Sequence, residues 1–174
     1  YRKARSTQEH ILRLSEAIHN GFKEKKCTIS IFLDCKAAFD AVWLDGMRYK
    51  LFQSGLPCKM IRLLSSFLTD RSLIVSEGDA QSIPVMLQAG TPQGSCLSPT
   101  IFIVYVNDVP NSNQTTMSQY ADDINIFTSD RDVLKAQEHA QRSLNEIQRW
   151  CSKWRIRLSP AKTKVILFTR CPTH

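Results

Sequence analysis

Two adjacent aspartates stand inside a segment that otherwise has the composition of a β-hairpin, "SQYADDINIF" at residues 118–127. Tyr120 and Ile124 on either side belong to the aromatic and β-branched types that favour strands, whereas aspartate is depleted there. Neighbouring carboxylates also repel each other. The pair Asp122-Asp123 therefore indicates either a solvated turn, for which aspartate is well suited, or a site where cations lie between the carboxylates.

The remaining hydrophobic pattern predicts a mixed domain of helices and strands. Residues 27–34, "CTISIFLD", read as a buried strand that ends in an acid. The apolar segment 100–109 reads as a helix or a strand, and its four-residue recurrence favours a helix. Further helices are predicted at 6–22 (with a Ser6/Glu9 capping box), 44–51, 59–68 and 130–154, and further strands on both sides of residues 77–79 and at 164–169.

Without the first helix and the hairpin around residues 77–79, the order is strand, helices, two strands, helix, strand. This is the β-α-β-β-α-β, or split βαβ, order of an α+β fold. In that topology the first strand neighbours the central hairpin, so Asp34 converges with Asp122 and Asp123. Three converging carboxylates need cations, and oxygen ligands without Cys or His favour Mg²⁺ or Mn²⁺. Two such ions about 3.5–4 Å apart serve in-line phosphoryl transfer in polymerases and nucleases.

The composition fits a nucleic-acid partner and a reducing compartment. The net charge of +7 over 174 residues suits a polyanion, although solvated helix ends and loops explain grouped lysines and arginines equally well. The six cysteines form no C-x-x-C pair or zinc spacing, which favours a reduced, intracellular protein, and the four histidines form no ligand pattern. No apolar run is long enough to span a bilayer. The missing initiator Met suggests a fragment of a longer polypeptide.

Four segments in order resemble the polymerase motifs A to D of reverse transcriptases, most closely those of non-LTR (LINE-type, jockey-like) retrotransposons. They are "FLDCKAAFDAVW" (32–43), "AGTPQGSCLSPTIFIVYVNDV" (89–109), "YADD" (120–123) and "WRIRLSPAKTKVILF" (154–168), preceded by "YRKARSTQEHIL" (1–12). The resemblance implies one reverse transcriptase domain fragment. Its core would be a palm, a ferredoxin-like antiparallel sheet with helices on one face. Residues 1–26 and 55–90 would be fingers/palm elements, residues 27–54 and 91–174 the palm core, and the thumb and N-terminal fingers would be missing.

The resemblance assigns a metal site for two Mg²⁺ or Mn²⁺ ions. Asp34 and Asp122 correspond to the family's metal ligands, Asp123 supports them, and the backbone carbonyl of Cys35 also faces a metal. The three aspartates are thereby the expected catalytic residues.

The resemblance also assigns nucleotide contacts. Phe39 matches the aromatic steric gate that excludes a ribose 2′-OH, the other interpretation being a core aromatic. Gln93 and Gly94 match the pair beside the incoming nucleotide and template, although "TPQGS" equally suits a loop before a helix capped by Ser95. Tyr120 corresponds to a residue near the primer end.

Basic residues complete the set. Lys162 matches the motif D lysine that donates a proton to pyrophosphate, with Lys164 as the competing candidate and a solvated lysine as the plain interpretation. Asp40 either orients loop residues or caps the following helix. The nucleic-acid contacts expected near the N-terminus are Arg2, Lys3 and Arg5.

The implied function is RNA-directed DNA polymerisation by two-metal-ion nucleotidyl transfer during retrotransposon copying. The implied partners are an RNA template, a DNA primer, dNTPs and the element RNA, with no membrane. The implied site of action is the nucleus after cytoplasmic synthesis, and the isolated fragment is expected to be inactive if its grip on primer–template needs the thumb. Other hypotheses are a group II intron maturase-type or retron enzyme and a catalytically silent nucleic-acid-binding remnant of a decayed element. A viral RNA-dependent RNA polymerase fits "TPQG" and Phe39 less well.

Overall fold

The computed structural model describes residues 7–170, which form two compact units. Within these residues, the first unit runs to residue 36 and resumes at 109, and the second comprises residues 37–108. The unit borders differ from the predicted division into fingers and palm segments at 26/27, 54/55 and 90/91. That functional division stays a prediction, because compactness does not report which segment grips which part of a substrate.

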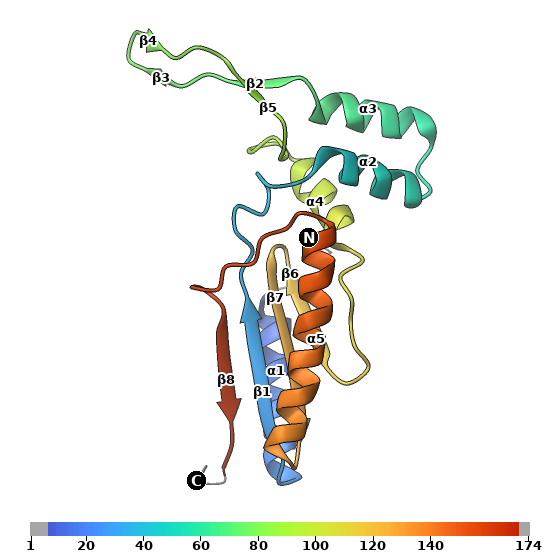
Figure 1. Cartoon of the computed structure of the whole chain (residues 1–174), viewed down its shortest axis with the longest axis vertical. Coiled ribbons are helices and arrows are strands. Elements are labelled where there is room, and N and C mark those ends of the chain that lie inside the picture. The colour runs from blue at the N-terminus through green and yellow to red at the C-terminus, as the bar shows by residue number, and fades with distance from the viewer. Residues whose placement is uncertain (1–6, 171–174) are drawn as a thin grey trace. The chain divides into compact units, whose positions relative to one another are not determined.

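The first unit is built on a four-stranded antiparallel sheet (Figure 1). The spatial order β6-β7-β1-β8 places the first strand beside the central hairpin, as the split βαβ order requires. The predicted strands at 27–34 and 164–169 and the hairpin of the two aspartates are confirmed. The strands are β1 (Cys27–Leu33), β6 (Thr116–Tyr120), β7 (Asp123–Asp130) and β8 (Lys164–Phe168).

Two helices cover the two faces of this sheet, α5 in front and α1 behind in Figure 1. A Cβ on Gly21 of α1 would lie 2.9 Å from the Thr28 hydroxyl, so alternate β1 residues from Thr28 onward face α1. Leu33 and the other odd residues face α5. Helices on one face were expected. That holds for α5, which belongs to the βαβ unit, while α1 lies on the opposite face. The helices are α1 (Thr7–Lys23) and α5 (Val133–Lys153).

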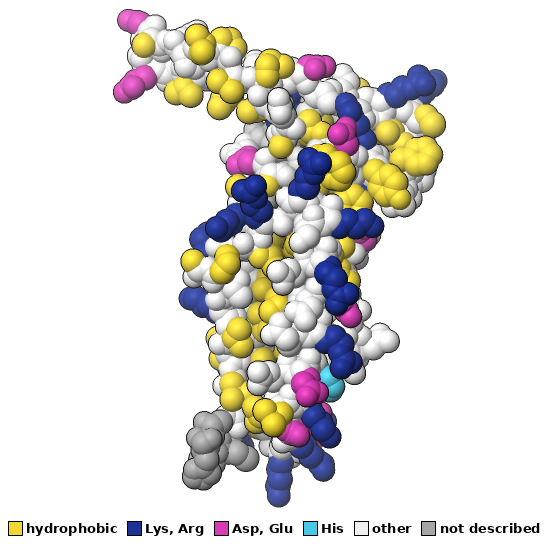
Figure 2. All heavy atoms as spheres, in the orientation of Figure 1, with side chains coloured by type: hydrophobic (Ala, Val, Ile, Leu, Met, Phe, Trp, Pro, Cys, Tyr) yellow, Lys and Arg dark blue, Asp and Glu magenta, His cyan; other side chains and the backbone are white. Residues whose placement is uncertain are grey.

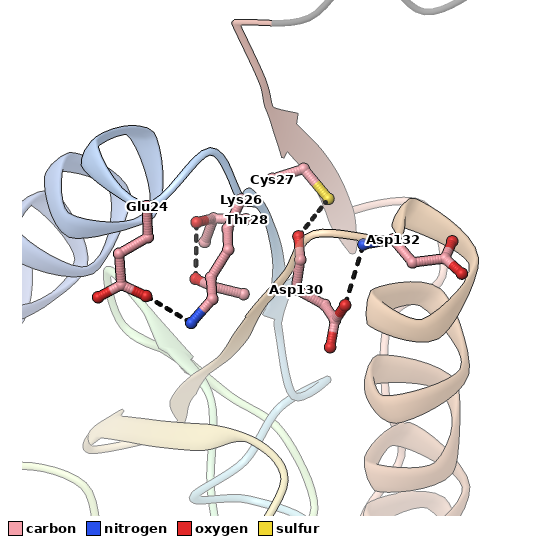
Figure 3. A network of polar contacts seen from close by, with 7 residues as sticks. Glu24, Lys26, Cys27, Thr28, Asp130 and Asp132 are labelled. Carbon is pink, nitrogen blue, oxygen red and sulfur yellow. Dashed lines mark hydrogen bonds and ion pairs between the residues drawn. The ribbon is translucent and has the colours of Figure 1, made fainter.

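Polar contacts fix the pairing of β1 with β7 at the end farthest from Asp34 (Figure 3). The Cys27 thiol donates to the Asp130 carbonyl at 3.2 Å, and the Thr28 and Ser129 hydroxyls lie 2.7 Å apart. The Asp130 carboxylate accepts from the Asp132 amide at 2.9 Å, and Asp132 in turn caps the first turn of α5. The helix predicted from residue 130 starts three residues later because these two aspartates form its cap. A one-residue slip would turn every strand side chain to the other face, so this register also sets which residues meet at the opposite end.

The second unit consists of three helices and a long β-hairpin. The apolar segment at 100–109 is a helix, so the strand interpretation is wrong. The hairpin predicted around residues 77–79 forms two short ladders, and Figure 2 shows hydrophobic side chains along it with acidic side chains at its tip. The elements are α2 (Leu44–Gln53), α3 (Cys58–Leu68), α4 (Ser98–Val106), β2 (Arg71–Leu73), β3 (Ser76–Glu77), β4 (Ala80–Gln81) and β5 (Val85–Leu87).

A buried lysine joins two helices of this second unit. Lys50 of α2 is 5% exposed, and its ammonium donates to the Tyr105 carbonyl and, at 2.5 Å, to the Asp108 carboxylate. A buried cation is tolerated only when it is paired and hydrogen-bonded. Met47 of α2 and Phe102 of α4 are also buried and belong to the apolar core of this unit.

No helix in residues 7–170 is long and apolar enough to cross a membrane. Among the same residues the cysteines are free thiols: Cys27, Cys35 and Cys151 are buried, and Cys58 and Cys96 are exposed.

Candidate active site

The sheet register brings Asp34 to the start of β7. Leu33, the last residue of β1, pairs with Ile124 in the antiparallel ladder, so continuing this register by one residue places Asp34 opposite Asp123, the first residue of β7. Directly opposed residues in such a ladder have Cα atoms about 4.5–5.5 Å apart. Two of the three predicted carboxylates are therefore neighbours across adjacent strands.

Asp122 adjoins this pair from the hairpin turn. The turn has only two residues, because Tyr120 and Asp123 are already paired. Ala121 has φ 53°, the left-handed conformation that such turns favour and that costs a non-glycine residue about 1–2 kcal/mol. Partial burial, and then the negative charges of Asp122 and Asp34, raise the pKa of Asp123. Mutual repulsion among the three aspartates is thus present in the folded chain.

A segment before β8 holds the backbone around Asp34. Its carbonyl accepts from the Ser159 amide at 2.8 Å, and the Lys36 amide donates to the Arg157 carbonyl at 2.7 Å. These two bonds lie on either side of an antiparallel bridge between Cys35 and Leu158. The carbonyl of Cys35 takes no part in either bond. The carbonyl predicted to face a metal is therefore not used by this bridge.

The same segment places Lys162 beside Asp34. A turn closed by bonds from the Lys162 and Thr163 amides to the Ser159 carbonyl, at 3.2 and 2.9 Å, presents the lysine. Its Nζ lies 3.5 Å from both carboxylate oxygens, with the lysine side chain 71% exposed and that of Asp34 27%. Lys164, the competing candidate, is the first residue of β8. The geometry favours Lys162 as the lysine of the site.

The Asp34, Asp123 and Lys162 side chains line a cavity of about 290 Å³ on the α1 face of the sheet. Tyr120, predicted to lie near the primer end, is 42% exposed and lines it too. The same cavity includes Asn125, whose amide donates to the Ser30 hydroxyl at 2.7 Å. The cavity therefore holds two carboxylates and a lysine beside apolar side chains such as Phe32 and Ile124.

His10 of α1 also lines this cavity. No role was predicted for it from the sequence. Its Nδ1 is hydrogen-bonded to the Ser118 hydroxyl, and its ring meets the Tyr120 ring edge-on with centroids 6.1 Å apart. The helical spacing of His10 with Leu14 and Gly21 puts all three on one side of α1. That spacing was the available signal, but the sequence did not show which sheet face this side would meet.

The donor set suits a hard divalent cation. The three aspartates offer carboxylate oxygens, the ligand type that Mg²⁺ and Mn²⁺ prefer. Oδ2 of Asp34 is buried and has no hydrogen-bond partner among the described residues. Burial raises the pKa of the Cys35 thiol to about 12, so that sulfur stays neutral and offers no thiolate ligand. Within residues 7–170, however, no three Asp, Glu, His or Cys side chains are grouped so that they could hold a metal ion. The positive charge beside Asp34 is the Lys162 ammonium.

The second unit carries Phe39, Gln93 and Gly94 of the predicted nucleotide contacts. The Phe39 ring stacks on Phe102 of α4 with centroids 4.4 Å apart, yet Phe39 remains partly exposed. The Gln93 amide donates to Asp40 Oδ1 at 2.8 Å, and Gly94 has φ 80°. Ser95 does not cap α4 as the alternative interpretation held, because the helix begins at Ser98 with Leu97 at its N-cap and without a side-chain cap. The Ser95 hydroxyl instead accepts from the Leu97 amide at 3.2 Å.

Arg2, Lys3 and Arg5 lie outside the described residues, so their expected contact with nucleic acid stays a prediction.

Comparison with known families matches residues 1–172 to the model described as reverse transcriptase (RNA-dependent DNA polymerase). The chain belongs to the reverse transcriptase family. The resemblance to jockey-like elements is also confirmed. The chain is 33% identical, over 97% of its length, to a probable RNA-directed DNA polymerase from transposon BS of Drosophila melanogaster. It is 31% identical, over 99% of its length, to the RNA-directed DNA polymerase from mobile element jockey of Drosophila funebris.

This reverse transcriptase chain spans 19–20% of the length of those two relatives. Its fold is shared with telomerase. The apo telomerase of Candida tropicalis truncated from its C-terminal domain superposes with a TM-score of 0.68 at 19% identity, over 98% of this chain and 37% of that one. The telomerase of Candida albicans in complex with a TWJ fragment of telomeric RNA gives a TM-score of 0.69 at 13% identity, over 97% and 31% of the two chains. The predicted α+β palm fold is confirmed.

Proposed function

We propose that this chain is the palm of an RNA-directed DNA polymerase that adds dNTPs to a primer 3′-OH while copying a non-LTR retrotransposon. The observation that supports this proposal best is the placement of Asp34 opposite Asp123, with Asp122 in the adjoining turn, in a chain of the reverse transcriptase family. The named relatives come from mobile elements, which favours retrotransposon copying over intron maturation or a retron.

The chain's own residues would hold the metals and the nucleotide. Asp34 and Asp122 would bind two Mg²⁺ or Mn²⁺ ions, supported by Asp123 and the Cys35 carbonyl. When bound, such ions activate the attacking hydroxyl and stabilise the charge on the leaving pyrophosphate. Lys162, released from Asp34, would donate a proton to that leaving group.

The proposed partners are an RNA template, a DNA primer, dNTPs and the element RNA, with the nucleus as the site of copying. The family and the net charge of +7 support a nucleic-acid partner, because neutralising backbone phosphates supplies most of such affinity. Phe39 supports the choice of dNTPs, because Phe102 stacks on its ring and limits how far the ring can turn away.

Nucleotide choice tests this function. With the chain expressed in its full reading frame, a DNA primer on an RNA template should be extended with dNTPs and Mg²⁺ but not with rNTPs. Phe39→Val should admit rNTPs while keeping dNTP addition. Extension with rNTPs by the unmodified protein would contradict the proposal. Tight primer–template binding with no extension under any condition would favour the silent-remnant hypothesis instead.

A further inference from the structure

In the second unit, the second half of motif A is hydrogen-bonded to the motif B loop. The Thr91 amide donates to the Phe39 carbonyl at 2.9 Å, and the Gly90 amide donates to the Val42 carbonyl at 2.9 Å. A third link, an antiparallel bridge between Trp43 and Ala89, extends the pairing. The two segments therefore behave as a short two-stranded ribbon.

Glycine allows this ribbon to close on Asp40. A Cβ built on Gly90 would lie 2.8 Å from the Asp40 carbonyl oxygen and 2.9 Å from its Cα, and Gly90 has φ 86°. Both facts exclude a larger residue without a shift of the backbone. The Arg71 guanidinium then holds the loop from outside by donating to the Ala89 and Gly90 carbonyls at 2.9 and 2.6 Å. Asp40 is thus held at a fixed distance from the loop that carries Gln93.

The Asp40 side chain fixes which way the Gln93 amide points. Nε2 of Gln93 donates to Asp40 Oδ1 at 2.8 Å. An ionised carboxylate only accepts hydrogen bonds, so the amide turns its NH₂ toward Asp40 and its carbonyl oxygen away. Both residues of this contact are exposed. Asp40 does not cap the following helix, whose N-cap is Trp43 without a side-chain hydrogen bond.

We infer that Asp40 is a positioning residue that presents the Gln93 carbonyl oxygen as an acceptor for a hydrogen-bond donor on the incoming nucleotide. The inference rests on the proposed polymerase function. Asp40 does not touch the nucleotide and acts only through Gln93. Loss of Asp40 leaves the amide free to rotate and to present a donor instead, which weakens nucleotide binding more than the chemical step.

The test is a double-mutant cycle in the full reading frame, measured as KM for dNTP and kcat in primer extension. Asp40→Ala should raise KM by roughly five- to tenfold, about the net contribution of one ordinary hydrogen bond for this exposed contact, with kcat changed less than about twofold. In a Gln93→Ala background, Asp40→Ala should have no further effect on KM, because its target is gone. Asp79→Ala, which removes an equal charge at the hairpin tip, should leave both constants unchanged.

Asp40→Asn guards against a folding artefact, because it keeps the shape of the side chain. Asparagine can accept from Gln93 or donate to it, so the amide orientation is no longer unique and KM should fall between those of the unmodified protein and Asp40→Ala. An equal KM effect in both Gln93 backgrounds, or no effect of Asp40→Ala in the unmodified one, would overturn the inference alone. Absence of extension by the unmodified protein would overturn the proposed function and this inference together.

Discussion

Replacing Lys162 with alanine should tighten divalent-metal binding at Asp34. The Lys162 ammonium lies 3.5 Å from both carboxylate oxygens of Asp34 and is the cation a bound metal would displace. The lysine side chain is 71% exposed, so solvent screens most of the attraction. Exposed ion pairs contribute about 0.2–1 kcal/mol, which corresponds to a gain of about 1.4- to 5-fold in metal affinity when the competing cation is removed.

The assay is a Mn²⁺ titration of the purified chain in which electron paramagnetic resonance counts free Mn²⁺. The matched control is Lys164→Ala, which removes the same charge from the start of β8. Affinity should increase for Lys162→Ala and stay close to the unmodified value for Lys164→Ala. Weaker Mn²⁺ binding in Lys162→Ala, or an equal gain in both variants, would refute the reasoning that Lys162 specifically competes for Asp34.

The same substitution should slow nucleotide addition even when the metal is saturating. A positioned general acid contributes on the order of 10²-fold or more to proton transfer. Single-turnover primer extension at high Mg²⁺ therefore should fall by roughly that factor in Lys162→Ala and little in Lys164→Ala. An unchanged rate would remove the proton-donor role and leave Lys162 as a counter-ion only.

Three further predictions concern stability and reactivity. Asp132→Ala removes the cap of α5 and should destabilise the fold by about 1 kcal/mol in chemical denaturation, whereas the stability of Asp132→Asn should stay within a few tenths of a kcal/mol of that of the unmodified protein. Gly90→Ala should lower the thermal midpoint more than an exposed alanine substitution does, because its Cβ meets the Asp40 backbone at 2.8 Å; an unchanged midpoint would mean that the ribbon gives way freely. The pKa of the buried Cys35 thiol is raised to about 12, so at pH 8–9 iodoacetamide should label exposed Cys58 first, and equal labelling rates would contradict that burial.

The sheet and its order could be predicted because local patterns and topology agreed. A β-branched run ending in Asp34, an apolar hairpin with Asp122-Asp123 at its bend and a long amphipathic helix leave few arrangements, and the split βαβ order selects one. The neighbourhood of the carboxylates then follows from register alone. Such inference needs no side-chain detail.

Contacts that join segments distant in sequence were harder to predict. The role of His10 depends on which sheet face receives α1, and that helix stands outside the βαβ pattern. The ion pair between Lys162 and Asp34 depends on a turn closed by Ser159, whose sequence resembles many solvated loops. The bond from Gln93 to Asp40 needs the close approach that Gly90 permits. A glycine in a loop does not indicate from the sequence which other segment packs against it.

The direct test of the central claim is primer extension by the protein and its Asp122→Asn variant. Both should be expressed in the full reading frame and assayed with an RNA template, a DNA primer, dNTPs and Mg²⁺. The substitution keeps the shape of the hairpin turn and removes one carboxylate charge, so primer–template binding should persist while extension is lost. Extension that survives in Asp122→Asn would contradict the carboxylate site. No extension by either protein, with binding retained, would contradict an active polymerase and leave a palm that grips nucleic acid without copying it.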